Sequence, residues 1–251
     1  MSDLSSSARN EDLIAHQRTL PAVVLTGLVL WSGCGSFASQ GINAEGVRLF
    51  DQTRYEEAMQ QFQRAIENDP TSADGYYNLA ATYHRVGTLG KQAADLTQAE
   101  RYYYLCLDRN PDHAECYRGL AVLLVEQGRA EEAFRLLQGW ADRRPNSPEP
   151  NIEIARLREE FGDREGAKQH LADALLVESS NARALAAMGR LREQDGDQGR
   201  ALANYQQSLT ANRFQPEVAA RVATLQSSAG YAPAAQTRGT ATLARDPTSL
   251  R

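Results

Sequence analysis

The sequence has no excess of basic residues. Its 251 residues include 27 Lys and Arg against 32 Asp and Glu, which gives a formal net charge of −5. Proteins that bind nucleic acid neutralise the phosphate backbone with Lys and Arg, so this balance argues against nucleic acid as the main partner. The composition, 42% hydrophobic and 24% charged, is that of a globular protein with a buried core.

Sequence signals of catalysis or of a cofactor are also missing. The four histidines, at positions 16, 84, 113 and 170, are scattered and show no metal-ligand spacing. The chain contains neither a glycine-rich phosphate loop nor a Gly-x-Ser-x-Gly turn. We therefore expect a protein that is not an enzyme and holds no metal or cofactor. An enzymatic role is retained only for a site completed by a partner subunit.

Cysteine is rare, with three residues in the chain. Cys106 and Cys116 fall at the end of one predicted helix and the start of the next. In an oxidising compartment the two thiols pair if their Cα atoms lie within about 7 Å, whereas buried free cysteine is common in protein cores. The sequence leaves both interpretations open.

Long apolar runs are absent, and the longest lies near the N-terminus. It extends from Pro21 to Leu30 without a charge and follows Arg18. A transmembrane helix needs about 20 apolar residues, so this run is too short to span a bilayer comfortably and fits the apolar part of a secretory signal. We expect residues 1–34 to be an export leader.

The end of this leader, Ser32-Gly33-Cys34, resembles the cleavage box of bacterial lipoproteins, in which small residues precede a cysteine that becomes the lipidated N-terminus. Trp31 stands where such boxes usually carry leucine. The resemblance implies that Cys34 carries a lipid anchor, that residues 35–38 form a tether, and that the protein is held at the cell envelope facing the periplasm. Plain cleavage, an uncleaved anchor and a cytosolic chain are the alternatives.

From residue 39 onward the sequence repeats with a period of 34. Glycines and alanines recur at this step: Gly128, Gly162, Gly196, Gly230, and Ala133, Ala167, Ala201, Ala235. A second set of small residues lies eight positions into each repeat: Gly46, Ala80, Ala121, Ala155, Gly189 and Ala223. Ala58 and Ala99 hold the same place in repeats one and two. In repeats one to five a larger apolar residue follows this alanine by four positions: Phe62, Tyr103, Leu137, Leu171 and Tyr205. Each repeat is predicted as a helix, a turn at the glycine and a second helix, which cross where side chains are small.

This pattern resembles the tetratricopeptide repeat (TPR). The resemblance implies an all-α, right-handed solenoid of six helix pairs over residues 39–251, with repeats that start near 39, 73, 114, 148, 182 and 216. The first and last repeats fit least, because Thr53 replaces the turn glycine and Gly239 stands where a large apolar residue belongs in the last helix, near 234–245.

Repeat two carries seven extra residues between Gly87 and Ala99. Seven residues are close to two helical turns, so a longer second helix that starts near Lys91 keeps Leu96 and Tyr103 on one face. A disordered loop is the alternative.

Proteins of the TPR family bind peptides or helices of other proteins in a concave groove lined by the first helices, so the resemblance implies a protein-interaction scaffold. The corresponding positions mix arginine, carboxylate and apolar residues: Tyr77, His84, Arg85, Arg118, Val122, Val125, Ile152, Arg156, Glu159, Arg183, Arg190 and Glu193. This mixture suits a segment of alternating charged and apolar character. Arg118, Arg156 and Arg190 come from three successive repeats and could face one acidic ligand, with pairing to nearby glutamates as the competing explanation.

A narrower function is implied by the leader and the repeats together. Pilotin lipoproteins of type IV pili resemble this chain in having a lipoprotein leader and about six such repeats. Assistance in assembling a pilus or secretion complex is therefore the alternative to a general envelope scaffold, and the sequence names no partner.

The leader makes the first testable prediction. If Cys34 is lipidated, the wild-type protein fractionates with membranes, because two or more acyl chains anchor a protein stably where one does not. The Cys34→Ala variant is expected in the soluble fraction. Wild-type protein found wholly soluble, with residues 1–33 still attached by mass spectrometry, would refute lipidation, and retention of the variant on membranes would indicate an uncleaved anchor.

Overall fold

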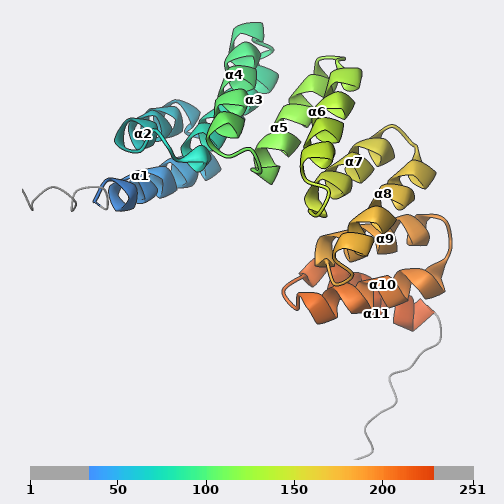
Figure 1. Cartoon of the computed structure of the whole chain (residues 1–251). Coiled ribbons are helices and arrows are strands. Elements are labelled where there is room, and N and C mark those ends of the chain that lie inside the picture. The colour runs from blue at the N-terminus through green and yellow to red at the C-terminus, as the bar shows by residue number, and fades with distance from the viewer. Residues whose placement is uncertain (1–33, 229–251) are drawn as a thin grey trace, which may run out of the picture.

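The structure is a computed structural model that describes residues 34–228, and within this range it holds eleven α-helices and no strand. Figure 1 shows the helices in antiparallel pairs that follow one another along a curved array, with α1 and α11 at opposite ends. The pairs are α1 (Cys34–Asp51) with α2 (Tyr55–Asn68), α3 (Ala73–Gly90) with α4 (Ala93–Arg109), α5 (Ala114–Glu126) with α6 (Ala130–Arg143), α7 (Glu149–Glu160) with α8 (Arg164–Val177), and α9 (Ala182–Gln194) with α10 (Gln198–Ala211), followed by α11 (Pro216–Ser228). The predicted all-α solenoid is confirmed.

Consecutive helices pack against each other along the whole array, and first helices of neighbouring repeats also touch, as between α3 and α5. The alanines at the crossing are buried, including Ala80, Ala121 and Ala155 of the first helices and Ala99 and Ala133 of the second. The first helices therefore form a layer of their own, which lines one face of the solenoid.

The small residue at each crossing is matched in volume to the large residue that faces it. In repeats one and five the first helix has glycine, and a Cβ atom on Gly46 or Gly189 would lie 2.5 Å from Phe62 or 2.8 Å from Tyr205. In repeats three and four alanine faces the smaller Leu137 and Leu171, which are also buried. Overpacked cores are destabilised, so an aromatic residue at this place requires glycine opposite.

In repeat two, the space for the aromatic ring comes from a glycine of the next repeat. Tyr103 is buried although Ala80, and not glycine, stands at the crossing. A Cβ atom on Gly119 of α5 would lie 2.5 Å from the Tyr103 ring. The space for this tyrosine therefore comes from repeat three.

Each turn inside a repeat contains one residue in the left-handed backbone conformation. Gly128, Gly162 and Gly196 have φ of 77°, 78° and 82°. Repeats one and two use Thr53 and Lys91 instead, with φ of 60° and 51°. Glycine adopts this conformation freely, whereas a side chain makes it costly.

The extra residues of repeat two lengthen both helices and form no irregular loop. α3 has 18 residues and α4 has 17, against 13 and 14 in α5 and α6. Gly87 does not form the turn expected of it: it is buried inside α3 against Leu96, and the chain reverses at Lys91. The lengthened pair extends beyond its neighbours (Figure 1).

The two ends of the chain lie partly outside the described residues. The leader 1–33 and the twelfth helix expected near 234–245 are both outside the range. α1 begins at Cys34, so the segment 35–38, predicted to be a tether, falls within this helix. Between residues 34 and 228, no helix combines the length and apolar character needed to cross a membrane.

The left-handed turn of repeat one generates the second prediction. Replacing Thr53 by glycine removes the steric cost of a β-branched residue at φ 60°, offset in part by the greater entropy of glycine in the unfolded chain. We expect Thr53→Gly to raise the free energy of unfolding by about 0.5–1 kcal/mol, measured by urea denaturation.

The reciprocal change is the matched control. A Cβ atom on Gly128 meets nothing within 4 Å, so Gly128→Thr introduces strain without a clash. It should lower the free energy of unfolding by about 1–2 kcal/mol. Equal stability of both variants and the wild type would show that the turn conformation carries no cost.

Candidate partner-binding groove

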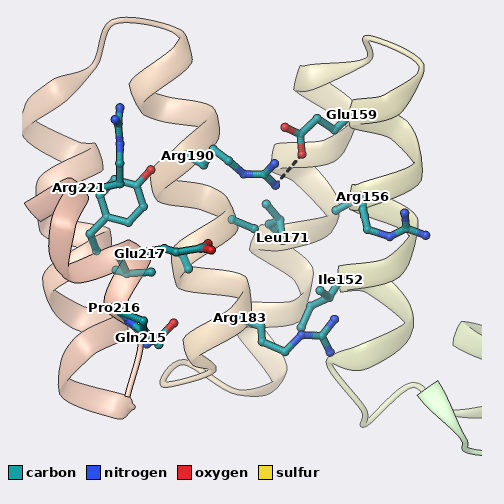
Figure 2. Close-up of a pocket in the computed structure, with 15 residues that line it drawn as sticks. Ile152, Arg156, Glu159, Leu171, Arg183, Arg190, Gln215, Pro216, Glu217 and Arg221 are labelled. Atoms are coloured by element: carbon teal, nitrogen blue, oxygen red, sulfur yellow. Dashed lines mark hydrogen bonds and ion pairs between the residues drawn. The ribbon is translucent and has the colours of Figure 1, made fainter. Parts of the chain in front are cut away.

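The first helices α7, α9 and α11 line an open cavity of about 540 Å³ on their shared face. Figure 2 shows the residues that line it. Its apolar lining comes from all three first helices and from α8: Ile152, Ala155, Leu171, Ala186, Ala187, Pro216 and Val218. A concave, mainly apolar surface with a few polar groups is the usual form of a binding site.

Arginines from the same helices surround this apolar surface, and three of them, Arg183, Arg190 and Arg221, pair with a glutamate of the preceding first helix. Arg190 Nη2 lies 2.8 Å from Glu159 Oε2, and a dashed line marks this pair in Figure 2. Arg221 of α11 pairs in the same way with Glu193 of α9. These pairs join neighbouring repeats across the groove, and the rim therefore carries both signs of charge.

Glu153 of α7 is the most deeply placed charge of this surface, with none of its side chain exposed. Arg118 of α5 and Arg183 of α9 each place Nη2 2.6 Å from its Oε1 atom, and Arg156 Nε lies 3.2 Å from Oε2. Burial alone disfavours the ionised carboxyl group, but the hydrogen bonds and charges of Arg118 and Arg183 outweigh it and hold the pKa of Glu153 below its ordinary value. One carboxylate thus links the first helices of repeats three, four and five.

The structure brings five of the residues expected in the groove into one cavity: Ile152, Arg156, Glu159, Arg183 and Arg190. Arg156 also pairs with Glu160, at 2.5 Å. The three arginines proposed as a ladder are therefore engaged by glutamates, as the competing explanation held. Whether they also contact a ligand stays a prediction.

The remaining expected groove residues lie outside this cavity and contact other parts of the protein. Glu193 accepts a hydrogen bond from the Tyr205 hydroxyl group, at 3.0 Å. Tyr77 packs against the rings of Tyr103 and His113, and Val122 and Val125 of α5 are both half-buried. Burial raises the pKa of Tyr77, with the nearby Glu115 adding to the effect.

His84 and Arg85 have polar partners within the repeats. His84 Nε2 lies 2.9 Å from Glu126 Oε2, and its Nδ1 lies 3.4 Å from the hydroxyl group of buried Tyr103. Arg85 Nε donates to the Tyr55 hydroxyl group at 3.5 Å. These contacts join elements of the solenoid, so His84 and Arg85 have structural partners at the positions where the sequence suggested ligand contacts.

Sequence reasoning missed Glu153 and the α11 residues of the cavity. Glu153 stands between Ile152 and Ile154, on a helix whose apolar residues signal burial. A carboxylate inside such a run, with arginines one repeat before and after it, was the available signal. Pro216 and Val218 lie in repeat six, whereas the predicted groove positions come from repeats two to five.

Comparison with known families agrees with this architecture. Residues 46–87 match a family described as TPR repeat, and residues 92–150 and 124–191 match one described as tetratricopeptide repeat. These matches together cover more than half of the chain. The chain belongs to the tetratricopeptide-repeat family.

Individual relatives share the repeat over part of their length. Tetratricopeptide repeat protein 8 of Homo sapiens is 34% identical over 97 residues, which are 39% of this chain and 17% of the human protein. A DnaJ homolog subfamily C member 7 homolog of Schizosaccharomyces pombe is 23% identical over 177 residues, 66% of this chain and 37% of that protein. The chain thus spans about a sixth of the first relative and just over a third of the second.

Two solved structures have the same fold at low sequence identity. A thermophilic TPR protein of Thermus thermophilus superposes with a TM-score of 0.55 at 23% identity, over 74% of this chain and 98% of that chain. PilF of Pseudomonas aeruginosa superposes with a TM-score of 0.51 at 17% identity, over 78% of this chain and 86% of that one. Both similarities concern the fold.

The buried carboxylate generates the third prediction. Glu153→Gln keeps the size of the side chain but removes the charge that Arg118, Arg156 and Arg183 share. Because these arginines are partly exposed, we expect a loss of about 2 kcal/mol at pH 7, below the usual cost of breaking a fully buried pair. Glu160→Gln, which breaks an exposed pair with Arg156, is the control and should cost about 0–1 kcal/mol.

The loss of unfolding free energy in Glu153→Gln should become smaller as the pH falls. The pKa of Glu153 is lower in the folded protein than in the unfolded chain, so its contribution is complete above the unfolded value of about 4.3 and is lost as the pH falls through the folded value. Urea denaturation at pH 7 and at pH 3 should therefore show a smaller difference between wild type and Glu153→Gln at pH 3. A difference that grows on acidification would contradict the assignment.

Proposed function

We propose that this protein is an interaction scaffold that holds a segment of a partner protein in the groove formed by α7, α9 and α11. The observation that carries the proposal is the apolar cavity of about 540 Å³ surrounded by charged side chains of both signs. Membership of the TPR family supports a role in protein binding. No catalytic residue enters the proposal.

The cavity lining defines the chemistry of the segment that fits. Ile152, Leu171 and Val218 offer apolar surface to one or two side chains of about leucine size. Arg183 and Arg190 add donors at the rim, since about half of each side chain stays exposed beside its glutamate partner. A suitable partner segment has an apolar side chain that fills the cavity, and beside it an acidic residue or a terminal carboxylate that pairs with arginine.

The place of action follows from the leader. An export signal that ends at Cys34 supports a scaffold held at the bacterial cell envelope by a lipid anchor. Assistance in assembling a pilus or secretion complex is the narrower form of this proposal, supported by the combination of leader and repeats. The scaffold function itself depends on the groove and not on the location.

The fourth prediction tests the groove by filling it. Ala186 lines the cavity and is half-buried, so Ala186→Phe places a ring where the partner's apolar side chain would lie. Ala203 of α10 is exposed and takes no part in the cavity, which makes Ala203→Phe a control of the same chemistry. The comparison is affinity capture with tagged wild type and both variants, followed by quantitative mass spectrometry of the retained proteins.

We expect the partners retained by wild type to fall at least tenfold with Ala186→Phe and to stay unchanged with Ala203→Phe. Circular dichroism melting curves should show that both variants keep the helical content of wild type. Equal retention of the same partners by folded Ala186→Phe would remove this cavity as the binding site.

A further inference from the structure

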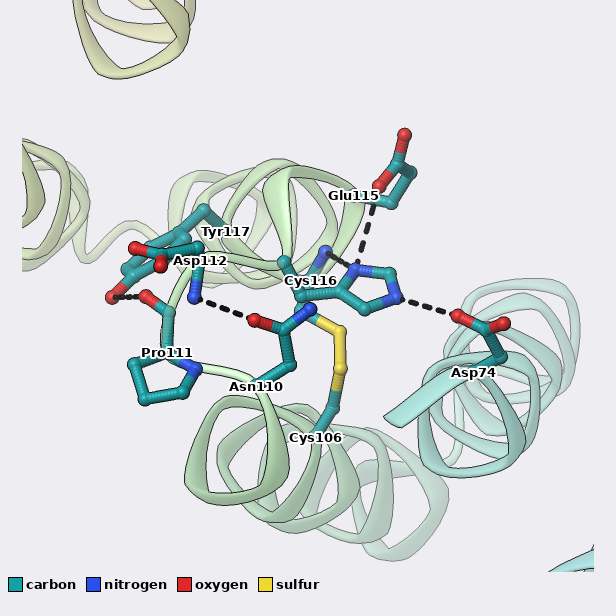
Figure 3. The surroundings of a disulfide bond; sticks show 9 residues. Asp74, Cys106, Asn110, Pro111, Asp112, Glu115, Cys116 and Tyr117 are labelled. Atoms are coloured by element: carbon teal, nitrogen blue, oxygen red, sulfur yellow. Dashed lines mark hydrogen bonds and ion pairs between the residues drawn. A yellow bond between two sulfur atoms is a disulfide. The ribbon is translucent and has the colours of Figure 1, made fainter. Parts of the chain in front are cut away.

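Cys106 and Cys116 form a disulfide at the junction of repeats two and three (Figure 3). Cys106 lies in the last turn of α4 and Cys116 in the first turn of α5, with 6.5 Å between their Cα atoms. Of the two interpretations that the sequence left open, the structure therefore shows the paired one. Both cysteines are fully buried, and His113, which lies between them in the sequence, is 8% exposed.

The three residues form a cluster of metal-ligand type. The Cys106 and Cys116 sulfur atoms and a ring nitrogen of His113 all lie within 4.8 Å of one another. In a tetrahedral zinc site, ligand atoms 2.0–2.3 Å from the metal lie roughly 3.3–3.8 Å apart. Small side-chain adjustments are enough to bring a dithiol form of this cluster to that spacing.

His113 is oriented from a neighbouring helix. Its Nε2 atom lies 3.0 Å from Oδ1 of Asp74 on α3. A carboxylate that accepts a hydrogen bond from one ring nitrogen leaves the other as an electron-pair donor, which is the usual arrangement around zinc-bound histidine. The free electron pair is on Nδ1.

Nδ1 can bind a metal without leaving the Cys116 N–H group unpaired. It accepts a long hydrogen bond of 3.3 Å from the Cys116 N–H group, as the N-cap of α5. The same N–H group also lies 3.1 Å from the His113 carbonyl oxygen. If Nδ1 turns to a metal, the backbone donor keeps this second acceptor.

We propose that Cys106, Cys116 and His113 bind one Zn²⁺ ion when the disulfide is reduced. A thiol reductant supplies two electrons and two protons to open the S–S bond, and metal binding then releases the two thiol protons as both sulfurs become thiolates. Zinc suits this mixed sulfur and nitrogen set. Three ligands leave a fourth position open to water, and the carboxylate nearest to it is Glu115, whose Oε2 atom lies 3.4 Å from Nδ1.

The disulfide and the zinc site exclude each other because both use the same two sulfur atoms. Each connects the end of α4 to the start of α5. The junction between repeats two and three is thus cross-linked in an oxidising compartment by the disulfide and in a reducing one by the metal.

The fifth prediction uses Co²⁺ as a spectroscopic probe for this site. The full chain is reduced with a phosphine, exchanged into reductant-free buffer under nitrogen, and titrated with Co²⁺. Thiolate-to-cobalt absorption in the near ultraviolet should saturate at one equivalent of Co²⁺ and disappear on addition of Zn²⁺. The oxidised chain should show no such absorption.

Variants distinguish the site from other thiols and from misfolding. Cys106→Ser should abolish the absorption, and Cys34→Ser should leave it unchanged. His113→Asn keeps an N-cap residue, because Asn181 holds the equivalent position before α9 and accepts from the Ala184 N–H group. It should keep the helical content and weaken Co²⁺ binding at least tenfold.

Asp74→Asn should weaken binding by about 10–100-fold, as expected when the partner of a metal-bound histidine is changed. Two results would overturn the proposal: no thiolate-to-cobalt absorption in the reduced wild type, or undiminished absorption in Cys106→Ser.

Discussion

The close crossing of two helices at small residues is the constraint on which each repeat depends. Helix axes approach most closely where side chains are smallest, and the space beside the contact is filled by one large residue. Glycine therefore faces Phe62 and Tyr205, while alanine faces Leu137 and Leu171. Tyr103 breaks this correspondence and takes its space from Gly119, so repeats two and three are packed as one unit. The disulfide crosses the same junction.

The stacking of these units places the first helices side by side, and the groove forms on the face that these helices share. Glu153 shows how charge is handled there, since its buried carboxylate is neutralised by arginines from the first helices before and after it. Closer to α11 the same kind of pairing occurs with more exposed partners, Arg190 with Glu159 and Arg221 with Glu193. The ion pairs set the register between repeats and leave the apolar centre of the groove uncovered.

The fold could be predicted from the sequence because the small residues at the helix crossings recur every 34 positions. The sequence was insufficient where a residue's role depends on the neighbouring repeat. Gly87 was expected at a turn, yet the extra residues continue α3 past it, and the reversal falls at Lys91. Periodicity also could not show that Glu153 joins three repeats or that Asp74 contacts His113, because such partners lie 30 or more residues away and depend on how far each repeat rotates.

The weak packing of α11 has a consequence for ligand release. α11 forms one wall of the groove, yet among its described residues only Leu225 is buried, and it packs mainly against α10. A helix with so little buried surface is held weakly by its neighbours and has a low local stability. A ligand in the groove would contact α11 together with α7 and α9, so binding would stabilise the packed position of α11. Local opening of α11 would then set the rate at which the ligand is released.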